Sequence, residues 1–241
     1  MLRLDSVIIR QDDFQLSADW QVKTGARIAV IGPSGAGKST LLSAIAGFQP
    51  LAGGSIWWDA TNLLPLLPGE RPLSILFQDQ NLFPHLSIIQ NVGLGLRPDL
   101  RLSAEQRDRI DTVLKRVGLG QHGKRRPAEL SGGERGRAAL ARAIIRGRPL
   151  LLLDEPFSAL GPALRQDMLT LLHEVVTESG ITTLLVTHSP EDARRFADQI
   201  VLVADSIAAP PVETEQLFAN PPPDLARYLG EFPAERFSTP T

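Results

Sequence analysis

The chain has 241 residues, of which 43% are apolar and 22% are charged, which is an ordinary composition for a globular protein. It contains no cysteine, and this excludes disulfides, zinc–thiolate sites, iron–sulfur clusters and cysteine nucleophiles. The net charge of −2 argues against a protein that coats nucleic acid, so no nucleic-acid partner is expected. The sequence shows neither a membrane-spanning apolar run nor a signal peptide, which predicts a cytosolic chain.

The charges are unevenly distributed along the chain. Residues 101–148 carry 13 basic and 5 acidic side chains, whereas residues 149–241 carry 5 basic and 14 acidic ones. A solvated helical face explains the basic middle region. The alternative is a surface that faces anionic lipid or an acidic partner.

The first elements in the chain are predicted strands. Residues 14–22 alternate between apolar and polar side chains, which is typical of a half-buried strand, and residues 2–10 and 54–59 also favour strands. Later apolar runs are short and continuous, as expected for strands covered on both faces. They are residues 27–31, 73–77, 150–154, 182–187 and 199–204.

Helical segments separate several of these runs. Strand signals are sparse within residues 83–148, where an amphipathic helix is predicted to begin after Ser103. Apolar residues also recur at helical spacing after Pro162. From residue 209 to 241, prolines are frequent, so this tail is expected to be irregular apart from a short helix near 213–219.

These patterns predict an α/β fold with a parallel sheet as its core. An antiparallel β portion is expected at the N-terminus, and a helical subdomain is expected as an insertion at about 83–148. The whole chain, residues 1–241, is predicted to be a single domain with a short proline-rich tail at about 209–241.

The strongest motif is GPSGAGKST, which fits the G-x-x-x-x-G-K-[ST] pattern between a predicted strand and a helical run. Its glycines let backbone N–H groups point at phosphates, and the following helix N-terminus attracts their charge. Lys38 would reach the terminal phosphates, and Ser39 would ligate Mg²⁺. The residues predicted to contact the nucleotide are Gly32, Pro33, Ser34, Gly35, Ala36, Gly37, Lys38, Ser39 and Thr40.

The buried run LLLLDE at residues 150–155 ends in two acids. Asp154, at the end of a strand, can hold the Mg²⁺ coordination shell. Glu155 can position a water molecule for attack on the γ-phosphorus, which favours hydrolysis over transfer to another acceptor. The alternative is that both acids cap the following turn.

A second glycine-rich segment, LSGGE, precedes another helical run. Ser131 and Glu134 form a capping box, which is a sufficient structural reason for both. Gly132 and Gly133 are harder to explain by capping because glycine costs helix entropy, whereas exposed N–H groups beside glycines bind anions. One nucleotide cannot easily occupy two such sites on separate lobes, so we expect a head-to-tail pair of chains with a nucleotide between them.

The set GPSGAGKST, Gln78, LSGGE, LLLLDEPFSAL and His188 resembles the ATP-binding subunits of ABC transporters in order and spacing. The resemblance covers about residues 1–205. It implies that Gln78 touches the magnesium ion and the attacking water, that His188 contacts the γ-phosphate, and that Ser131, Gly132, Gly133 and Glu134 close over the ATP of the opposite chain. It assigns catalysis to Lys38, Gln78, Glu155 and His188, and metal binding to Ser39, Gln78 and Asp154.

Three positions depart from the family pattern. Glu134 replaces the usual glutamine, and little loss is expected because glutamate still completes the capping box. Gly161 replaces an aspartate after the general base, which predicts slower or less coupled hydrolysis without loss of ATP binding. Gln11 stands where the family usually stacks adenine on an aromatic side chain, and Phe14 is a weak substitute with a competing role in the core.

The stretch after Gln78 is predicted to approach a membrane permease, with Leu82, Phe83 and Pro84 lining a groove for a permease helix. Ordinary packing is an equal alternative. Residues 77–96, 155–172 and 201–205 resemble the ATP-binding subunits of bacterial thiamine importers. The alternatives are importers of iron, polyamine, sulfate or molybdate, and non-transport ABC ATPases. The resemblance implies ATP and Mg²⁺, a homodimer, integral-membrane permease subunits and, indirectly, a periplasmic solute-binding protein. It places the chain at the cytoplasmic face of the cell inner membrane.

Overall fold

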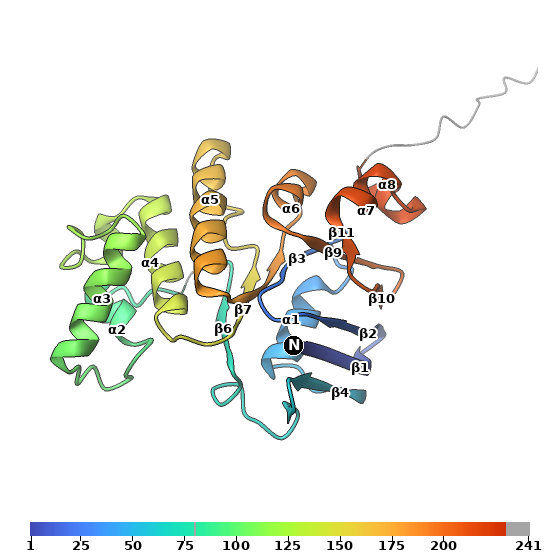
Figure 1. Cartoon of the computed structure of the whole chain (residues 1–241), viewed down its shortest axis with the longest axis horizontal. Helices are drawn as coiled ribbons and strands as arrows, with labels where there is room; N and C mark the ends of the chain where they lie inside the picture. The colour runs from blue at the N-terminus through green and yellow to red at the C-terminus, as the bar shows by residue number, and fades with distance from the viewer. Residues whose placement is uncertain (80, 230–241) are drawn as a thin grey trace, which may run out of the picture.

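The computed structural model describes residues 1–79 and 81–229. Within this part of the chain, eleven strands form one sheet in the order β5-β4-β1-β2-β10-β9-β3-β8-β7-β6, and β11 pairs with β9 (Figure 1). The strands are β1 (Leu2–Gln11), β2 (Phe14–Val22), β3 (Arg27–Ile31), β4 (Gly53–Trp58), β5 (Thr61–Asn62), β6 (Leu73–Leu76), β7 (Leu150–Asp154), β8 (Thr182–Val186), β9 (Gln199–Ala204), β10 (Ile207–Ala208) and β11 (Val212–Glu213).

The helices cover the sheet and extend beyond one edge of it. They are α1 (Lys38–Ala46), α2 (Ile88–Gly93), α3 (Ala104–Arg116), α4 (Gly132–Ile144), α5 (Pro162–Ser179), α6 (Pro190–Phe196), α7 (Thr214–Ala219) and α8 (Pro223–Leu229), with a short 3₁₀ turn at Pro127–Glu129. In Figure 1, α2, α3 and α4 gather at the left, and the antiparallel strands lie at the right.

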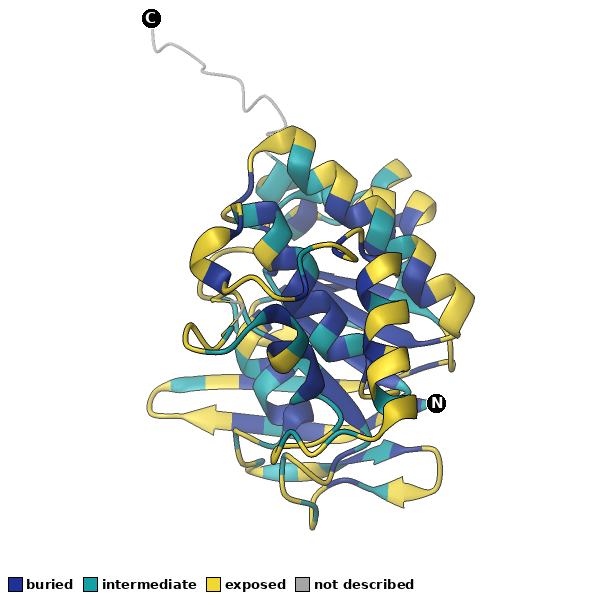
Figure 2. Cartoon of the chain, turned by 90° about the vertical axis from the view of Figure 1, so that its left-hand side faces the viewer, coloured by how far each residue is buried: buried dark blue, intermediate teal, exposed yellow. Residues whose placement is uncertain are grey.

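The sheet has a parallel part and an antiparallel part, and the side-chain patterns explain the difference. Strands β9, β3, β8, β7 and β6 pair in parallel, and β3, β7 and β8 are almost entirely buried. Helices cover them on both faces, as Figure 2 shows by the buried strands behind exposed helix surfaces. By contrast, β1, β2 and β4 pair antiparallel, and β2 alternates between buried and more exposed residues. The predicted α/β fold class is confirmed.

The helices α2, α3 and α4 lie in sequence between β6 and β7. Each begins with a capping box in which a serine accepts from the third helical N–H and a Gln or Glu accepts from the serine N–H. The pairs are Ser87–Gln90, Ser103–Gln106 and Ser131–Glu134. The three helices share an apolar cluster that includes Ile88, Ile110, Leu114 and Ala138. Their designation as a subdomain of a single domain, residues 1–241, stays a prediction.

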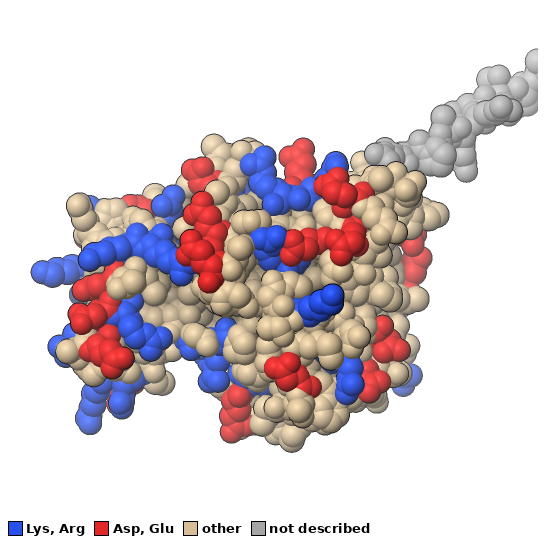
Figure 3. Space-filling view, viewed as in Figure 1, with Lys and Arg blue, Asp and Glu red and all other residues tan. Residues whose placement is uncertain are grey.

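Basic side chains are frequent on this helical part. In Figure 3, Lys and Arg side chains gather at the left, over the region of α2, α3 and α4, with acidic side chains between them. This matches the excess of basic residues in 101–148. No helix among residues 1–79 and 81–229 is long and apolar enough to cross a membrane.

The C-terminal segment differs from the sequence expectation. The expected helix near 213–219 is present as α7, but β10 and β11 precede it and a further helix, α8, follows it. We therefore correct the expectation of an irregular tail over its described part; residues 230–241 lie outside the described residues. Pro223 begins α8, where a missing N–H is tolerated, so prolines here start a helix and do not exclude one.

Candidate nucleotide-binding site

The candidate site lies where the parallel strands end. Val30 of β3 is paired with Val186 of β8, which is also paired with Asp154 of β7. The loops that follow these three strands therefore emerge side by side. Ligands bind at this carboxyl edge in open α/β sheets, and the predicted residues are found on these loops.

The phosphate loop has the backbone that anion binding requires. Gly35 and Gly37 have φ angles of 79° and 102°, in the left-handed region that side chains disfavour. No atom lies within 4 Å of a Cβ built on Gly35, whereas one built on Gly37 would lie 2.5 Å from the Phe14 ring. Gly37 also begins α1 without any side-chain cap, so the first N–H groups of this helix have no such acceptor.

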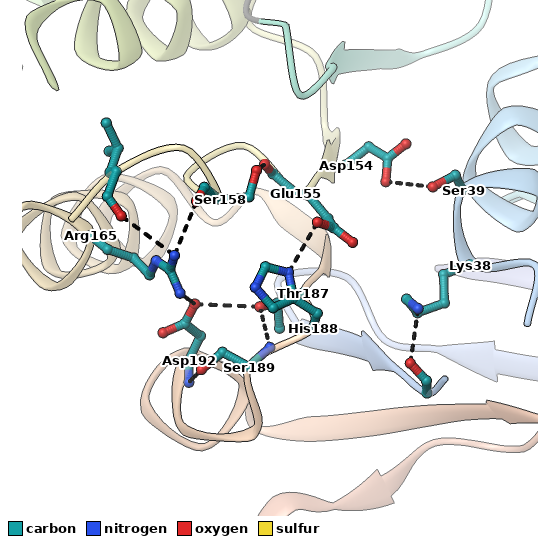
Figure 4. Close-up of polar contacts among 12 residues, drawn as sticks. Lys38, Ser39, Asp154, Glu155, Ser158, Arg165, Thr187, His188, Ser189 and Asp192 are labelled. Carbon is teal, nitrogen blue, oxygen red and sulfur yellow. Dashed lines mark hydrogen bonds and ion pairs between the residues drawn. The ribbon is translucent and has the colours of Figure 1, made fainter. Parts of the chain in front are cut away.

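Lys38 folds back over the loop. Its Nζ donates hydrogen bonds to the carbonyl oxygens of Gly32 at 2.9 Å and Pro33 at 2.8 Å. Figure 4 shows Lys38 across from Ser39, Asp154 and Glu155. Burial lowers the pKa of Lys38, and the negative charges of Glu155 and Asp154 oppose this shift. A buried ammonium held only by carbonyl groups is well placed to exchange them for phosphate oxygens.

The predicted metal ligands Ser39 and Asp154 are brought together. Ser39 Oγ donates to Asp154 Oδ1 at 2.9 Å. Burial raises the pKa of Asp154; the hydrogen bond from Ser39 lowers it, the charge of Glu155 raises it and that of Lys38 lowers it again. A cation between these oxygens would remove the penalty of the buried carboxylate.

The donor set fits Mg²⁺. The hydroxyl of Ser39 and the carboxylate of Asp154 are hard oxygen ligands, which magnesium prefers. The described residues contain no group of three or more His, Cys, Asp or Glu that could hold a metal. Magnesium itself needs only one or two protein oxygens, since it completes its shell with water and phosphate.

Glu155 has a strained backbone and points at His188. Its φ of 45° is left-handed, which costs a non-glycine residue about 1–3 kcal/mol and is typical of functional positions. The backbone is held because Glu155 N–H donates to the Val186 carbonyl at 3.1 Å and Ser158 Oγ donates to the Glu155 carbonyl at 3.1 Å. Glu155 Oε2 lies 3.0 Å from His188 Nδ1 (Figure 4). The carboxylate thus reaches the histidine and remains partly open to solvent.

A cavity of about 300 Å³ lies beside the phosphate loop. Phe14 lines it and also packs against the apolar core; its role as an adenine-stacking residue stays a prediction. Gln11 lines it as well, without an aromatic ring for a base to stack on. The lining residues are Gln11, Phe14, Ser34, Gly35, Gly37, Lys38, Ser39, Thr40 and Glu155.

Gln78 lies at the same edge of the sheet. It is an exposed residue two positions beyond the end of β6, and Leu76 in that strand pairs with Leu153 of β7. Its backbone position is therefore next to the loop that carries Asp154 and Glu155. It does not line the cavity beside the phosphate loop.

The LSGGE segment stands apart from this cluster, since none of its residues lines the cavity. Ser131 and Glu134 hold each other: Ser131 N–H and Oγ each donate to Glu134 Oε2 at 2.7 Å, and Glu134 N–H donates to Ser131 Oγ at 3.3 Å. These bonds lower the pKa of Glu134. A Cβ on Gly133 would lie 2.6 Å from the Leu164 side chain, so close packing against α5 also favours a glycine there.

Two residues near the cluster gave no signal in the sequence. Arg165 Nη2 donates to the Ser158 carbonyl at 3.1 Å, and its Nη1 lies 3.9 Å from Asp192 Oδ2, so it links the loop after Glu155 to α6 (Figure 4). Tyr228 donates to the main-chain carbonyl of His188. The contacts of Arg165 with Asp192 and of Tyr228 with His188 join segments far apart in sequence, where a local pattern carries no information.

Three features together define the class of P-loop nucleoside-triphosphate-binding proteins. They are the parallel sheet, the loop after β3, and the acids Asp154 and Glu155 at the end of β7. A model of the family described as ABC transporter matches residues 16–158, which is more than half of the chain. The chain therefore belongs to the ABC transporter family, as one of its ATP-hydrolysing cassettes.

Relatives cover nearly the whole chain. The thiamine import ATP-binding protein of Cereibacter sphaeroides is 60% identical over 230 residues, covering 95% of this chain and 100% of the relative. The protein of the same name from Ruegeria sp. (strain TM1040) is 53% identical, with the same coverage. A solved dimeric ATP-binding cassette, in a post-hydrolysis state with ADP and Pi, is similar with a TM-score of 0.76 and 30% identity, covering 89% of this chain and 99% of that one.

Proposed function

We propose that the chain is the ATP-binding subunit of an importer that takes up thiamine and is driven by ATP hydrolysis in a head-to-tail dimer. The observation that carries the mechanism is the separation of the LSGGE segment from the cavity beside the phosphate loop. The assignment to thiamine rests on relatives named as thiamine import ATP-binding proteins at 60% and 53% identity.

The residues of the cluster divide the work at one nucleotide. The phosphate loop binds the phosphates with its N–H groups, and Lys38 leaves its carbonyl partners for the terminal phosphates. When bound, Mg²⁺ neutralises phosphate charge, and Ser39, Asp154 and Gln78 are the residues that would hold it. Glu155 accepts a proton from the attacking water. His188, whose Nδ1 lies 3.0 Å from Glu155 Oε2, contacts the γ-phosphate, so this contact depends on whether the triphosphate is bound.

The second half of each nucleotide site comes from the partner copy. Ser131, Gly132, Gly133 and Glu134 at the start of α4 would meet the γ-phosphate bound to the other chain. Contacts that exist only with the triphosphate favour the closed dimer, and hydrolysis removes that bias. A solved neighbour is described as a dimeric cassette bound to ADP and Pi, which supports this arrangement.

The coupling to a permease is assigned to a groove of about 320 Å³ between the sheet and the helical part. Phe83 lines it and is 46% exposed, as a docking side chain should be. Leu82 packs against two apolar clusters instead, and Pro84 does not line the groove. We therefore propose Phe83 as a contact with the permease helix, whereas Leu82 belongs to the packing of the apolar clusters. The remaining lining residues are Ile75, Leu76, Phe77, Asn81, Leu94, Gly95, Ala139, Arg142, Ala143 and Arg146.

The groove suits an amphipathic helix of a permease. Its apolar floor comes from β6 and α4, and the exposed Arg146 at its wall can meet a helix C-terminus or an acidic side chain. Such docking would hold the subunit at the cytoplasmic face of the inner membrane. A periplasmic solute-binding protein would then act on the permease without touching this chain.

The test is reconstitution of the chain with the permease and the solute-binding protein of a bacterial thiamine importer. We expect thiamine with its binding protein to stimulate ATP hydrolysis, and the Glu155→Gln complex to show no stimulation. Phe83→Asp should abolish stimulation while the isolated subunit keeps its basal ATPase. Stimulation by iron, a polyamine, sulfate or molybdate in place of thiamine would reject the solute assignment and leave the ATPase assignment intact.

A further inference from the structure

The C-terminal helix α8 lies against the part of the molecule that carries His188. Leu225 of α8 is fully buried in the same apolar cluster as Phe196 of α6 and Leu217 of α7, and Tyr228 packs against that cluster. Figure 1 shows α7 and α8 next to α6 at the upper right. The chain thus returns to the nucleotide edge of the sheet after its last strand.

Tyr228 reaches the loop between β8 and α6. Its hydroxyl donates to the main-chain carbonyl of His188. Burial raises the pKa of this phenol, and the charge of Glu155 raises it further, which also places the ring close to the proposed general base. The phenol therefore keeps its proton, and remains a donor, at neutral pH.

The His188 carbonyl has no role in the hydrogen bonding of α6. In that helix, Ser189 is the N-cap: its hydroxyl accepts from Asp192 N–H, and its carbonyl accepts from Ala193 N–H. His188 lies just before the cap, where the carbonyl direction is not fixed by the helix. On the other side of the peptide, Ser189 N–H donates to Thr187 Oγ1 at 3.1 Å. Tyr228 thus supplies the hydrogen-bond donor for the His188 carbonyl.

We propose that Tyr228 is a positioning residue for His188, so that docking of the C-terminal helix α8 sets the place of this histidine relative to Glu155 and thereby the rate of hydrolysis. The inference rests on the proposed contact of His188 with the γ-phosphate. It assigns a catalytic consequence to a segment outside residues 16–158, which the family model matches.

The first test is steady-state ATPase activity of the full-length chain as Tyr228→Phe, which removes only the hydroxyl. A lost hydrogen bond of about 0.5–1.5 kcal/mol predicts a kcat about 2 to 12 times lower. KM for ATP should stay at the wild-type value because the phosphate loop is retained. The lost hydrogen bond should lower the melting temperature by only a few degrees, so kcat is compared at a temperature where both proteins are fully folded. Arg227→Gln is the matched control, since Arg227 is exposed on the same helix and pairs with Asp224 at 3.5 Å.

The His188→Ala variant distinguishes the proposed role of Tyr228 from the proposed role of His188, on which it rests. Full activity of His188→Ala would reject the proposed role of His188. Loss of activity in His188→Ala together with wild-type kcat in Tyr228→Phe would reject only the role of Tyr228. A loss of activity in Tyr228→Phe that is fully explained by the fraction of unfolded protein at the assay temperature would reduce the contact to a structural one and would also overturn the proposal.

A spectroscopic measurement keeps the proposal testable without turnover. The chain contains a single tyrosine, so ¹³Cζ-labelled tyrosine gives one resonance. We expect it to titrate above free tyrosine in the nucleotide-free protein and to shift when ATP is added to the Glu155→Gln variant. A resonance that titrates like free tyrosine would show that α8 is not docked and would overturn the proposal.

Discussion

The phosphate loop and the LSGGE segment both begin helices with glycine-rich sequence, but their helix starts differ in hydrogen bonding. Gly37 caps α1 with no side-chain acceptor, so the N–H groups there are open to a ligand. Ser131 caps α4 with a complete capping box, and Glu134 adds a carboxylate at the same end. The first helix start needs an anion, whereas the second is already satisfied within its own chain.

This difference has a consequence for the proposed cycle. Lys38 in the phosphate loop and Asp154 at the end of β7 carry charges that burial disfavours in the absence of a ligand. The LSGGE segment has no such penalty, because its own bonds stabilise the Glu134 carboxylate. We expect ATP to bind the phosphate loop first, and the partner's LSGGE segment to add the smaller free energy that closes the dimer.

The largest expected effect is that of Glu155→Gln. Loss of a general base lowers kcat about 10²- to 10⁴-fold, while ATP binding persists because the phosphate loop is unchanged. The ATP-bound dimer should accumulate, which light scattering coupled to size-exclusion chromatography measures. Lys38→Ala is the control for binding and should stay monomeric. A Glu155→Gln protein that is monomeric in saturating ATP would contradict the head-to-tail dimer.

Ser131→Ala tests whether the LSGGE segment is more than a helix cap. Ser103 begins α3 with the same capping box, so Ser103→Ala is a matched control. Both variants should lose about 1 kcal/mol of unfolding free energy, the usual cost of a lost N-cap. Only Ser131→Ala should also lose ATPase activity and ATP-driven dimerisation. Equal ATPase activity in the two variants would reduce LSGGE to a structural element.

Asp154→Asn should stabilise the nucleotide-free protein while it abolishes Mg²⁺-dependent hydrolysis. Because burial raises the pKa of Asp154 in the folded state, the wild type loses stability as the pH rises from the ordinary pKa of aspartate through the raised one. The gain in melting temperature should therefore be absent at acidic pH and present at neutral pH, where about 1 kcal/mol gives about 2–4 °C. In the presence of Mg²⁺ and ATP, the wild type should instead have the higher melting temperature. A variant that is less stable at neutral pH would contradict the assigned penalty.

The smallest expected effect is that of Gly161→Asp. A Cβ at Gly161 meets no atom within 4 Å, and the extended backbone, with φ of −64° and ψ of 159°, suits an N-cap before Pro162. An aspartate there should raise the unfolding free energy by a few tenths of a kcal/mol. The added carboxylate should also increase permease-coupled ATPase activity. An unchanged coupled rate would show that the glycine does not weaken communication across the dimer.

The sequence predicted the nucleotide edge well because its signals are local. The expected strands 27–31, 150–154 and 199–204 match β3, β7 and β9 in both ends, and the capping box at Ser131 is present. Runs covered on both faces, and side chains that cap their own helix, are encoded within a few residues. The frequent prolines wrongly predicted irregular structure where α8 forms, because proline is compatible with the first turn of a helix.

The amino-acid sequence by itself determined the element order, the phosphate loop and the acid pair, because each depends on neighbours along the chain. Only the tertiary structure decided that Ser39 meets Asp154, that Glu155 takes a left-handed backbone opposite His188, and that Tyr228 returns to the His188 carbonyl. The physical reason is that strand order and helix docking bring these groups together across 33 to 115 positions, and that choice is made by burial of the whole core.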